Sequence, residues 1–269
     1  MERSEIARTY LKELDVRNQS LDLEFLTKIT RRHVSTFAFS SVACQLGEDL
    51  PLDLESLFDR IVTQRRGGYC FEQNGLLFGI LEELGYRVEL YLARVIYNKD
   101  VHPGLTHRIT LVELNGLKYV ADVGFGPLGP AVPVLMSEQE TKDDGRIFRI
   151  AERHPREYHM QVLKEDGFFS LYRFDLVRYG QADCELGHFF SHKHPNATFV
   201  NHLVVSRIIG SEVRSLRDLE YWVSVNDCMQ KQRVRNADGL QRILRDDFGI
   251  RVTDEECRTL YERSNRQLG

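Results

Sequence analysis

The spacing of apolar residues changes along this chain of 269 residues, and the change limits the folds that it can adopt. Up to about residue 85, apolar residues recur every three or four positions, which is typical of helices that bury one face. Three such stripes are Ile6, Tyr10, Leu11 and Leu14; Leu21, Phe25, Leu26 and Ile29; and Leu54, Leu57, Phe58 and Ile61. Short segments join them, so we expect a small helical bundle over residues 1–85.

From residue 86 the pattern becomes that of β-strands. Segments rich in Val, Ile, Tyr and Phe alternate with turn residues. The predicted strands lie within residues 86–97, 108–114, 117–123, 157–164 and 168–177. Two hairpin turns are expected, at Asn115-Gly116 and around Glu165-Asp166-Gly167. Residues 86–195 should therefore form a mostly antiparallel sheet that is curved or barrel-like.

Residues 196–269 contain both helix-like and strand-like patterns. The stretch "HLVVSRII" is strand-like, and Leu240, Ile243 and Leu244 indicate a helix that ends near Gly249. Thr253-x-x-Glu256 has the spacing of a capping box that opens another helix. These features predict a small α/β segment, and the whole chain is expected to have an α+β fold.

Charge and cysteine usage narrow the function classes. The 36 basic and 40 acidic residues give a net charge of −4, which offers no electrostatic basis for binding nucleic acid or an anionic membrane. No secretory signal and no apolar run of membrane-spanning length is found, so we expect a cytoplasmic protein acting on a small molecule. The odd number of cysteines and the absence of CxxC pairs predict reduced thiols and no metal site. They are Cys44, Cys70, Cys184, Cys228 and Cys257.

The segment "RRGGYCFEQN" places Cys70 at the start of a predicted helix. The unpaired N–H groups and the dipole of a helix start favour a thiolate. Gly67 and Gly68 would let the chain turn sharply there and leave room for a substrate at the sulfur. Cys70 is thus a candidate nucleophile. The alternative interpretation is an ordinary buried cysteine.

A histidine and a carboxylate meet in the hairpin "THRITLVELNGLKYVADVGFG". A two-residue turn at Asn115-Gly116 pairs Leu114 with Leu117, which sets Asp122 opposite Ile109. His107 then lies on the same face as Asp122, as its diagonal neighbour. Cys, His and Asp together fit an activated nucleophile whose base is oriented by a third group. Alternatively, the two residues are an ordinary surface histidine and strand-end aspartate.

Taken together, "RRGGYCFEQN", "THRITLV" and "ADVGFG" resemble the arylamine N-acetyltransferase family, whose members carry RGGxCFExN and DVGFG segments with a histidine before a strand. Three further stretches, "DLESLFDRIV", "ELGYRVELYLARV" and "LQRILRDDFGIRVT", are also similar to the family. The resemblance implies a helical bundle that carries the nucleophile (1–85), a β-barrel-like domain with the histidine and aspartate (86–195) and an α/β lid (196–269). It also implies a Cys70–His107–Asp122 triad of the papain and transglutaminase type.

The activity implied by the resemblance is ping-pong transfer of an acetyl group from acetyl-CoA to arylamines or aryl hydrazines, as in xenobiotic metabolism. Phe39, Val95 and Phe125 would line the acceptor slot, while Gly124 and Gly126 would let CoA pass close to the backbone. The usual Pro-Phe-Glu-Asn stretch of the family is replaced here by Ala38-Phe39-Ser40-Ser41. Acceptor preference therefore does not follow from the resemblance, and the sequence gives no indication of the oligomeric state.

Other functions remain open at this level. One is an amide synthase of the same family that acts on a biosynthetic intermediate. Another is a peptide hydrolase or transglutaminase-like enzyme, because those enzymes carry Cys, His and Asp or Asn in the same chain order. A third is a binding scaffold without activity. Of the remaining residues, Arg66 is expected to support the cysteine turn, Trp222 to lie in the core of the last part, and His188, His192 and His194 to lie in a polar loop rather than a metal site.

Overall fold

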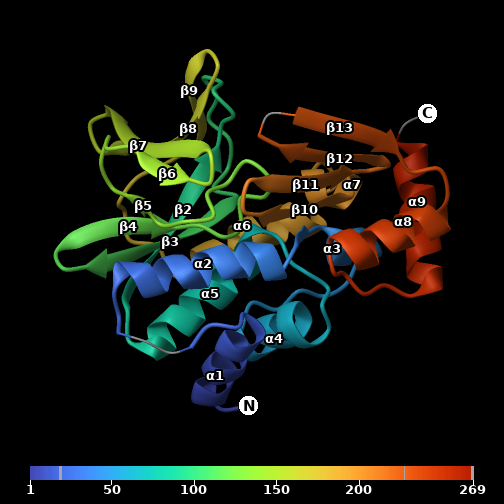
Figure 1. Cartoon of the computed structure of the whole chain (residues 1–269), viewed down its shortest axis with the longest axis horizontal. Helices are drawn as coiled ribbons and strands as arrows, with labels where there is room; N and C mark the ends of the chain where they lie inside the picture. Colours follow the sequence, from blue (N-terminus) through green and yellow to red (C-terminus); the bar gives the residue numbers. More distant parts are fainter. Residues whose placement is uncertain (18–19, 227, 268–269) are drawn as a thin grey trace.

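The N-terminal part of the protein is helical, as the apolar stripes predict. The computed structural model describes residues 1–17, 20–226 and 228–267. The first helices are α1 (Arg3–Glu13), α2 (Leu23–Thr36), α3 (Val42–Leu46), α4 (Leu54–Phe58), which continues into the π-helical turn η1 (Asp59–Thr63), and α5 (Cys70–Leu84) (Figure 1). The three predicted stripes fall on α1, on α2 and on α4 with η1. All their residues belong to one buried cluster or pack against it, except Leu21, which is exposed and precedes α2.

Helix α5 is the central element of this part. It packs against α1 and α4 on one side and against strands β2 and β3 of the large sheet on another. Gly75 and Gly79 allow this close approach, since a Cβ at either position would lie under 3.0 Å from Leu57 or Leu54. Because α5 is covered on several sides, its first residue, Cys70, is held inside the protein.

The middle part is an eight-stranded antiparallel sheet in the order β5-β4-β3-β2-β9-β8-β7-β6, which forms a nearly closed barrel (Figure 1). Its strands are β2 (Arg87–Val95), β3 (His107–Leu114), β4 (Leu117–Ala121), β5 (Val134–Leu135), β6 (Thr141–Asp143), β7 (Arg146–His154), β8 (Glu157–Lys164) and β9 (Gly167–Phe174). Both predicted hairpins are confirmed, with Leu114 opposite Leu117 and Lys164 opposite Gly167.

Strands β5, β6 and β7 escape the sequence analysis. The first two have only two or three residues, too few to show a period. In β7, the buried Phe148 and Ile150 alternate with arginine, but the strand ends in the charged run "ERH", which hides the pattern.

The C-terminal part contains a second antiparallel sheet, in the order β1-β10-β11-β12-β13. Its strands are β1 (Phe39–Ser40), β10 (Val204–Ile209), β11 (Glu212–Arg217), β12 (Glu220–Val225) and β13 (Cys228–Arg233), and α8 (Ala237–Arg242), η2 (Ile243–Asp247) and α9 (Asp254–Arg266) follow. The predicted capping box of α9 is confirmed, because Thr253 and Glu256 exchange hydrogen bonds of 2.8 and 3.2 Å. The expected α+β fold is likewise confirmed.

Two elements connect the large sheet to the second one, α6 (Gln181–Lys193) and α7 (Thr198–Asn201). The predicted polar loop over His188 and His192 is wrong, since both residues lie within α6. His188 is buried there and bonds Tyr69 and the carbonyl of Leu50. Within the described ranges, no helix is long and apolar enough to cross a membrane.

Candidate active site

The turn before α5 contains two glycines, Gly67 and Gly68, whose lack of a side chain lets other segments of the protein pack against them. Gly67 has φ of +69°, a backbone conformation that favours glycine, and a Cβ there would lie 2.7 Å from the carbonyl oxygen of Ala38. A Cβ at Gly68 would lie 2.9 Å from that of Glu72. The expectation that these glycines leave room for a substrate is therefore wrong, because strand β1 and helix α5 occupy that space.

Charged side chains fix this turn. Arg66 is buried and pairs with Glu48 and with Glu256 of α9, the latter at 2.9 Å, which agrees with its predicted supporting role. Glu72 pairs with Arg60 in the interior and also accepts a hydrogen bond of 3.2 Å from the N–H of Tyr69. The first turn of α5 is thus held from both sides, which limits the positions open to the thiol that it carries.

Cys70 and His107 come together where this turn meets the start of β3. Cys70 is 4% exposed, and its Sγ lies 3.4 Å from the carbonyl oxygen of Thr106, the residue before His107. His107 Nε2 lies 2.7 Å from Oδ2 of Asp122, and both of these residues are buried. The diagonal contact predicted from the hairpin register is therefore confirmed.

The pKa values of His107 and Asp122 differ from those of free side chains. Burial lowers the pKa of His107, but the charge and hydrogen bond of Asp122, with a smaller effect of Cys70, outweigh it and raise this pKa to about 10. Burial raises the pKa of Asp122, yet His107 and hydrogen bonds from Asn74 and Gly124 outweigh this effect and hold the pKa below its usual value. An imidazolium facing a carboxylate is therefore favoured at neutral pH.

Asn74 is a site residue that the sequence analysis missed. Its Nδ2 donates to Asp122 Oδ1 at 2.8 Å and to the carbonyl of Arg108 at 2.6 Å, while its Oδ1 accepts from the N–H of Val123 at 2.9 Å. It lies one helical turn after Cys70, so the i, i+4 spacing within "CFEQN" was the available signal. Asn74 therefore joins the helix that carries the thiol to the hairpin that carries the base.

Gly124 explains how closely these two elements approach. A Cβ at this position would lie 2.8 Å from both Asn74 Nδ2 and Cys70 Cα. Two aromatic rings also contact the imidazole of His107. The ring centroid of Phe125 lies 5.2 Å from that of the imidazole, in an edge-on contact, and the ring centroid of Tyr172 lies 4.8 Å from it. The imidazole is thus held by a carboxylate on one side and by apolar rings on others.

A cavity of about 440 Å³ opens over the thiol. The predicted residues that line it are Phe39, Cys70, Val95, His107, Gly124 and Phe125. Asp122 lies outside the lining, bonded to His107. Gly126 is also outside it and lies with φ of +86° near Phe39 and Ser206. All the predicted residues are therefore close to one site, but Gly126 does not face the cavity.

The far wall of this cavity comes from segments that the sequence analysis did not connect with the site. Its residues include Tyr97, Phe190, Phe199, Arg217 and Trp222. Trp222 is half-buried and faces the cavity, so the prediction that it belongs to the core is wrong. No local signal marks these residues, since an aromatic or charged residue in a strand, helix or loop does not show what its side chain meets.

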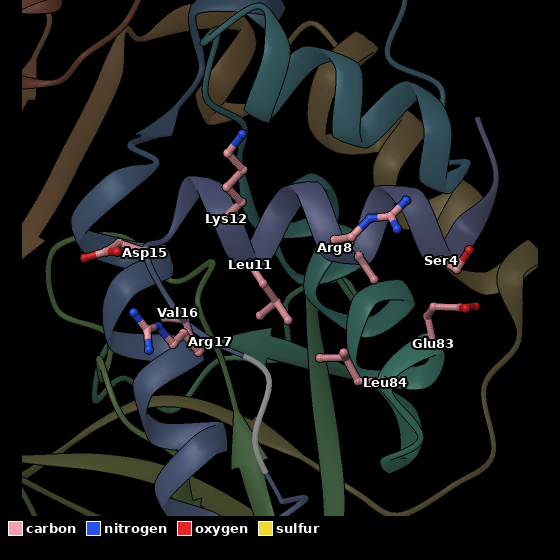
Figure 2. A pocket seen from close by; sticks show the side chains of 10 residues that line it. Ser4, Arg8, Leu11, Lys12, Asp15, Val16, Arg17, Glu83 and Leu84 are labelled. Carbon is pink, nitrogen blue, oxygen red and sulfur yellow. The ribbon is translucent and has the colours of Figure 1, made fainter.

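A larger hollow of about 620 Å³ lies elsewhere, between α1 and the end of α5. Figure 2 shows Leu11 projecting from α1 on the side that faces Leu84; Arg8 and Lys12 of α1 also line the hollow. It contains none of the predicted site residues. Across the described residues, no group of three or more His, Cys, Asp or Glu side chains is arranged to hold a metal ion.

Comparison with known proteins shows which family this chain belongs to. The family model described as N-acetyltransferase matches residues 22–257, most of the chain. The chain belongs to the arylamine N-acetyltransferase family. It is 31% identical to the arylamine N-acetyltransferase of Escherichia coli (strain K12) over 240 residues, 87% of this chain and 85% of that protein.

Solved structures of arylamine N-acetyltransferases have the same fold over nearly the whole chain. The enzyme from Salmonella typhimurium superimposes with a TM-score of 0.90 at 25% identity, covering 96% of this chain and 98% of that one. The Mycobacterium marinum enzyme in complex with CoA superimposes with a TM-score of 0.90 at 26% identity, covering 97% and 98%. The family assignment therefore holds for sequence and structure alike.

Proposed function

We propose that this protein transfers an acetyl group from acetyl-CoA to the nitrogen of an arylamine or aryl hydrazine, through an acetyl-Cys70 intermediate. The observation that carries the proposal is a thiol in a cavity beside a histidine whose Nε2 lies 2.7 Å from a buried carboxylate. Family membership and the CoA complex of the Mycobacterium marinum relative support acetyl-CoA as the donor. We therefore assign nucleophile, base and orienting group to Cys70, His107 and Asp122.

The first half-reaction loads the cysteine. Since Asp122 engages Nε2 of His107, Nδ1 is the ring nitrogen that holds the proton given up by Cys70, so that a thiolate faces an imidazolium at neutral pH. The thiolate attacks the thioester carbon, the bond from that carbon to the sulfur of CoA breaks, and the imidazolium returns its proton to the leaving thiolate. One thioester replaces another, so the acetyl group stays reactive on Cys70.

The second half-reaction passes the acetyl group to the amine. After CoA leaves, the amine attacks the acetyl-cysteine, His107 takes a proton from the nitrogen, and the sulfur departs as the amide forms. The oxyanion that develops needs hydrogen-bond donors. The first N–H groups of a helix have no partner within it, so those of Cys70 and Phe71 at the start of α5 are suited to this role.

The cavity suits flat, weakly basic amines. Phe39, Val95 and Phe125 supply apolar walls on which an aromatic ring packs well. Arylamines and aryl hydrazines are unprotonated, and hence nucleophilic, at neutral pH, whereas alkylamines are mostly protonated. The five cysteines are all free thiols, in agreement with a reducing compartment, and we propose the cytoplasm as the site of the reaction.

Intact-protein mass spectrometry tests the proposal. The protein is mixed with acetyl-CoA alone, beside a Cys70→Ala control. We expect one added acetyl group that is absent from the control and disappears when an arylamine or hydrazine is added. A folded protein that gains no acetyl group, although its Cys70 alkylates readily, would exclude acetyl-CoA as the donor.

A further inference from the structure

Arg108 is a buried cation without a carboxylate partner among the described residues. Three arginines are buried in the described part of the chain, and two of them are paired, Arg60 with Glu72 and Arg66 with Glu256. Arg108 is only 4% exposed, yet its guanidinium forms no hydrogen bond or ion pair with any residue that the structure describes, and its Nε is fully buried. A buried charge without a counter-charge is costly, so this guanidinium requires an acceptor that bears negative charge.

Arg108 lies on the face of β3 that packs against α5. Along this strand, Ile109 belongs to the buried cluster of the barrel, whereas Val112 belongs to the cluster of the helical part. Side chains alternate between the two faces of a strand, so Arg108 and Thr110 share the α5 face, and His107 lies on the other. The hydroxyl of Thr110 is also buried and has no hydrogen-bond partner among the described residues. Two unbonded polar groups therefore lie on one face of β3, with Cα atoms about 6.6 Å apart.

The described residues around this guanidinium supply no negative charge. The Cζ of Arg108 lies 5.2 Å from the ring centroid of Phe78, and an aromatic ring attracts a cation without neutralising it. Among the described residues, Cys184 is the one titratable group whose charge acts on Arg108. Burial raises the pKa of the Cys184 thiol to about 11, although Arg108 acts in the opposite direction, so this thiol is neutral at pH 7. The counter-charge must therefore come from outside these residues.

We propose that Arg108 binds a monovalent inorganic anion of the size of chloride between β3 and α5. One such ion balances one guanidinium, and Thr110 offers a second donor on the same face. A Cβ at Gly75 of α5 would lie 3.2 Å from Nη1 of Arg108, and this close approach favours a small ion over phosphate. The ion joins β3 to α5 beside Asn74, whose Nδ2 donates to the Arg108 carbonyl at 2.6 Å. It lies on the opposite face of β3 from the cavity over Cys70, so the inference does not depend on the proposed acetyl transfer.

Chloride titration tests this site in solution. Urea unfolding of the wild-type protein is measured at rising concentrations of sodium chloride, with sodium gluconate holding the ionic strength constant, because gluconate is too large for the site. The same series is measured for Arg108→Met, which removes the charge but keeps a long side chain, and for Arg258→Met, whose arginine is exposed on α9. In the wild type and in Arg258→Met, we expect the ratio of folded to unfolded protein to rise about elevenfold when chloride reaches about ten times its dissociation constant. Arg108→Met should show no such rise.

Bromide locates the ion directly, because it replaces chloride and scatters X-rays anomalously. Crystals of the wild-type protein soaked in sodium bromide should show an anomalous peak beside the Arg108 guanidinium. Equal unfolding in chloride and gluconate overturns the proposal, and a peak seen without a chloride effect in solution overturns it as an adventitious ion only. A chloride effect that persists in Arg108→Met, or a bromide peak found only elsewhere, also overturns it. If Arg108→Met does not fold, the wild-type titration and the position of the bromide peak decide together.

Discussion

Replacing Asp122 by asparagine should remove the negative charge that keeps His107 protonated. The substitution keeps the shape of the side chain and an oxygen that can accept from Asn74 and Gly124. It removes the negative charge 2.7 Å from His107 Nε2. A pKa raised from 6.5 to about 10 corresponds to roughly 5 kcal/mol in favour of the imidazolium. Without the carboxylate, burial lowers the pKa of His107 and only the smaller effect of Cys70 opposes it, so this pKa should drop below 6.5.

This change is measurable without turnover. Nuclear magnetic resonance of histidine-labelled protein, with His107→Gln to assign the signal, should show the imidazole protonated through neutral pH in the wild type and neutral at pH 7 in Asp122→Asn. Alkylation of Cys70 at pH 7 should slow in the variant, because no imidazolium then stabilises the thiolate. The rate of Cys70 acetylation by acetyl-CoA should fall about 10³- to 10⁴-fold.

The reasoning would be refuted by a variant in which His107 still titrates far above pH 7. It would also be refuted by unchanged alkylation and acetylation rates in a variant whose His107 has become neutral. Urea unfolding at pH 7 provides the control, because a variant that remains folded shows that any loss of rate arises at the site.

Further predictions concern the same elements. The raised pKa of His107 stabilises the fold fully below about pH 6.5, and this contribution is lost as the pH rises to about 10. The unfolding free energy of the wild type relative to His107→Gln should therefore decline by up to about 1.4 kcal/mol per pH unit in that window, measured by urea unfolding. Gly124→Ala forces a Cβ to 2.8 Å from Asn74 and should destabilise by about 1–3 kcal/mol, whereas Gly104→Ala, whose Cβ meets nothing closer than 3.6 Å, should not. Asn74→Ala removes a donor to Asp122 and should lower the rate of Cys70 acetylation about 10- to 100-fold in stopped-flow assays; an unchanged rate would show that Asp122 needs no such support.

Much of the fold can be predicted from local sequence patterns, namely the spacing of apolar residues and the turn residues. The helical stripes before residue 85 fall on α1, α2 and α4, and the Asn115-Gly116 turn sets the register of β3 and β4. That register alone predicts the contact of His107 with Asp122, because side chains on paired strands alternate between two faces. Strands β5 and β6 were not predictable in this way, since two or three residues show no period.

The sequence by itself determined which residues carry the proposed chemistry, since a cysteine at a helix start and a histidine paired with an aspartate across a hairpin depend on short-range geometry. Only the tertiary structure decided what surrounds them. Arg217 and Trp222 lie over 100 residues from Cys70, on a sheet that begins with β1 from the other end of the chain. Their approach depends on how whole layers pack, and a strand's alternation records which residues share a face but not what that face meets.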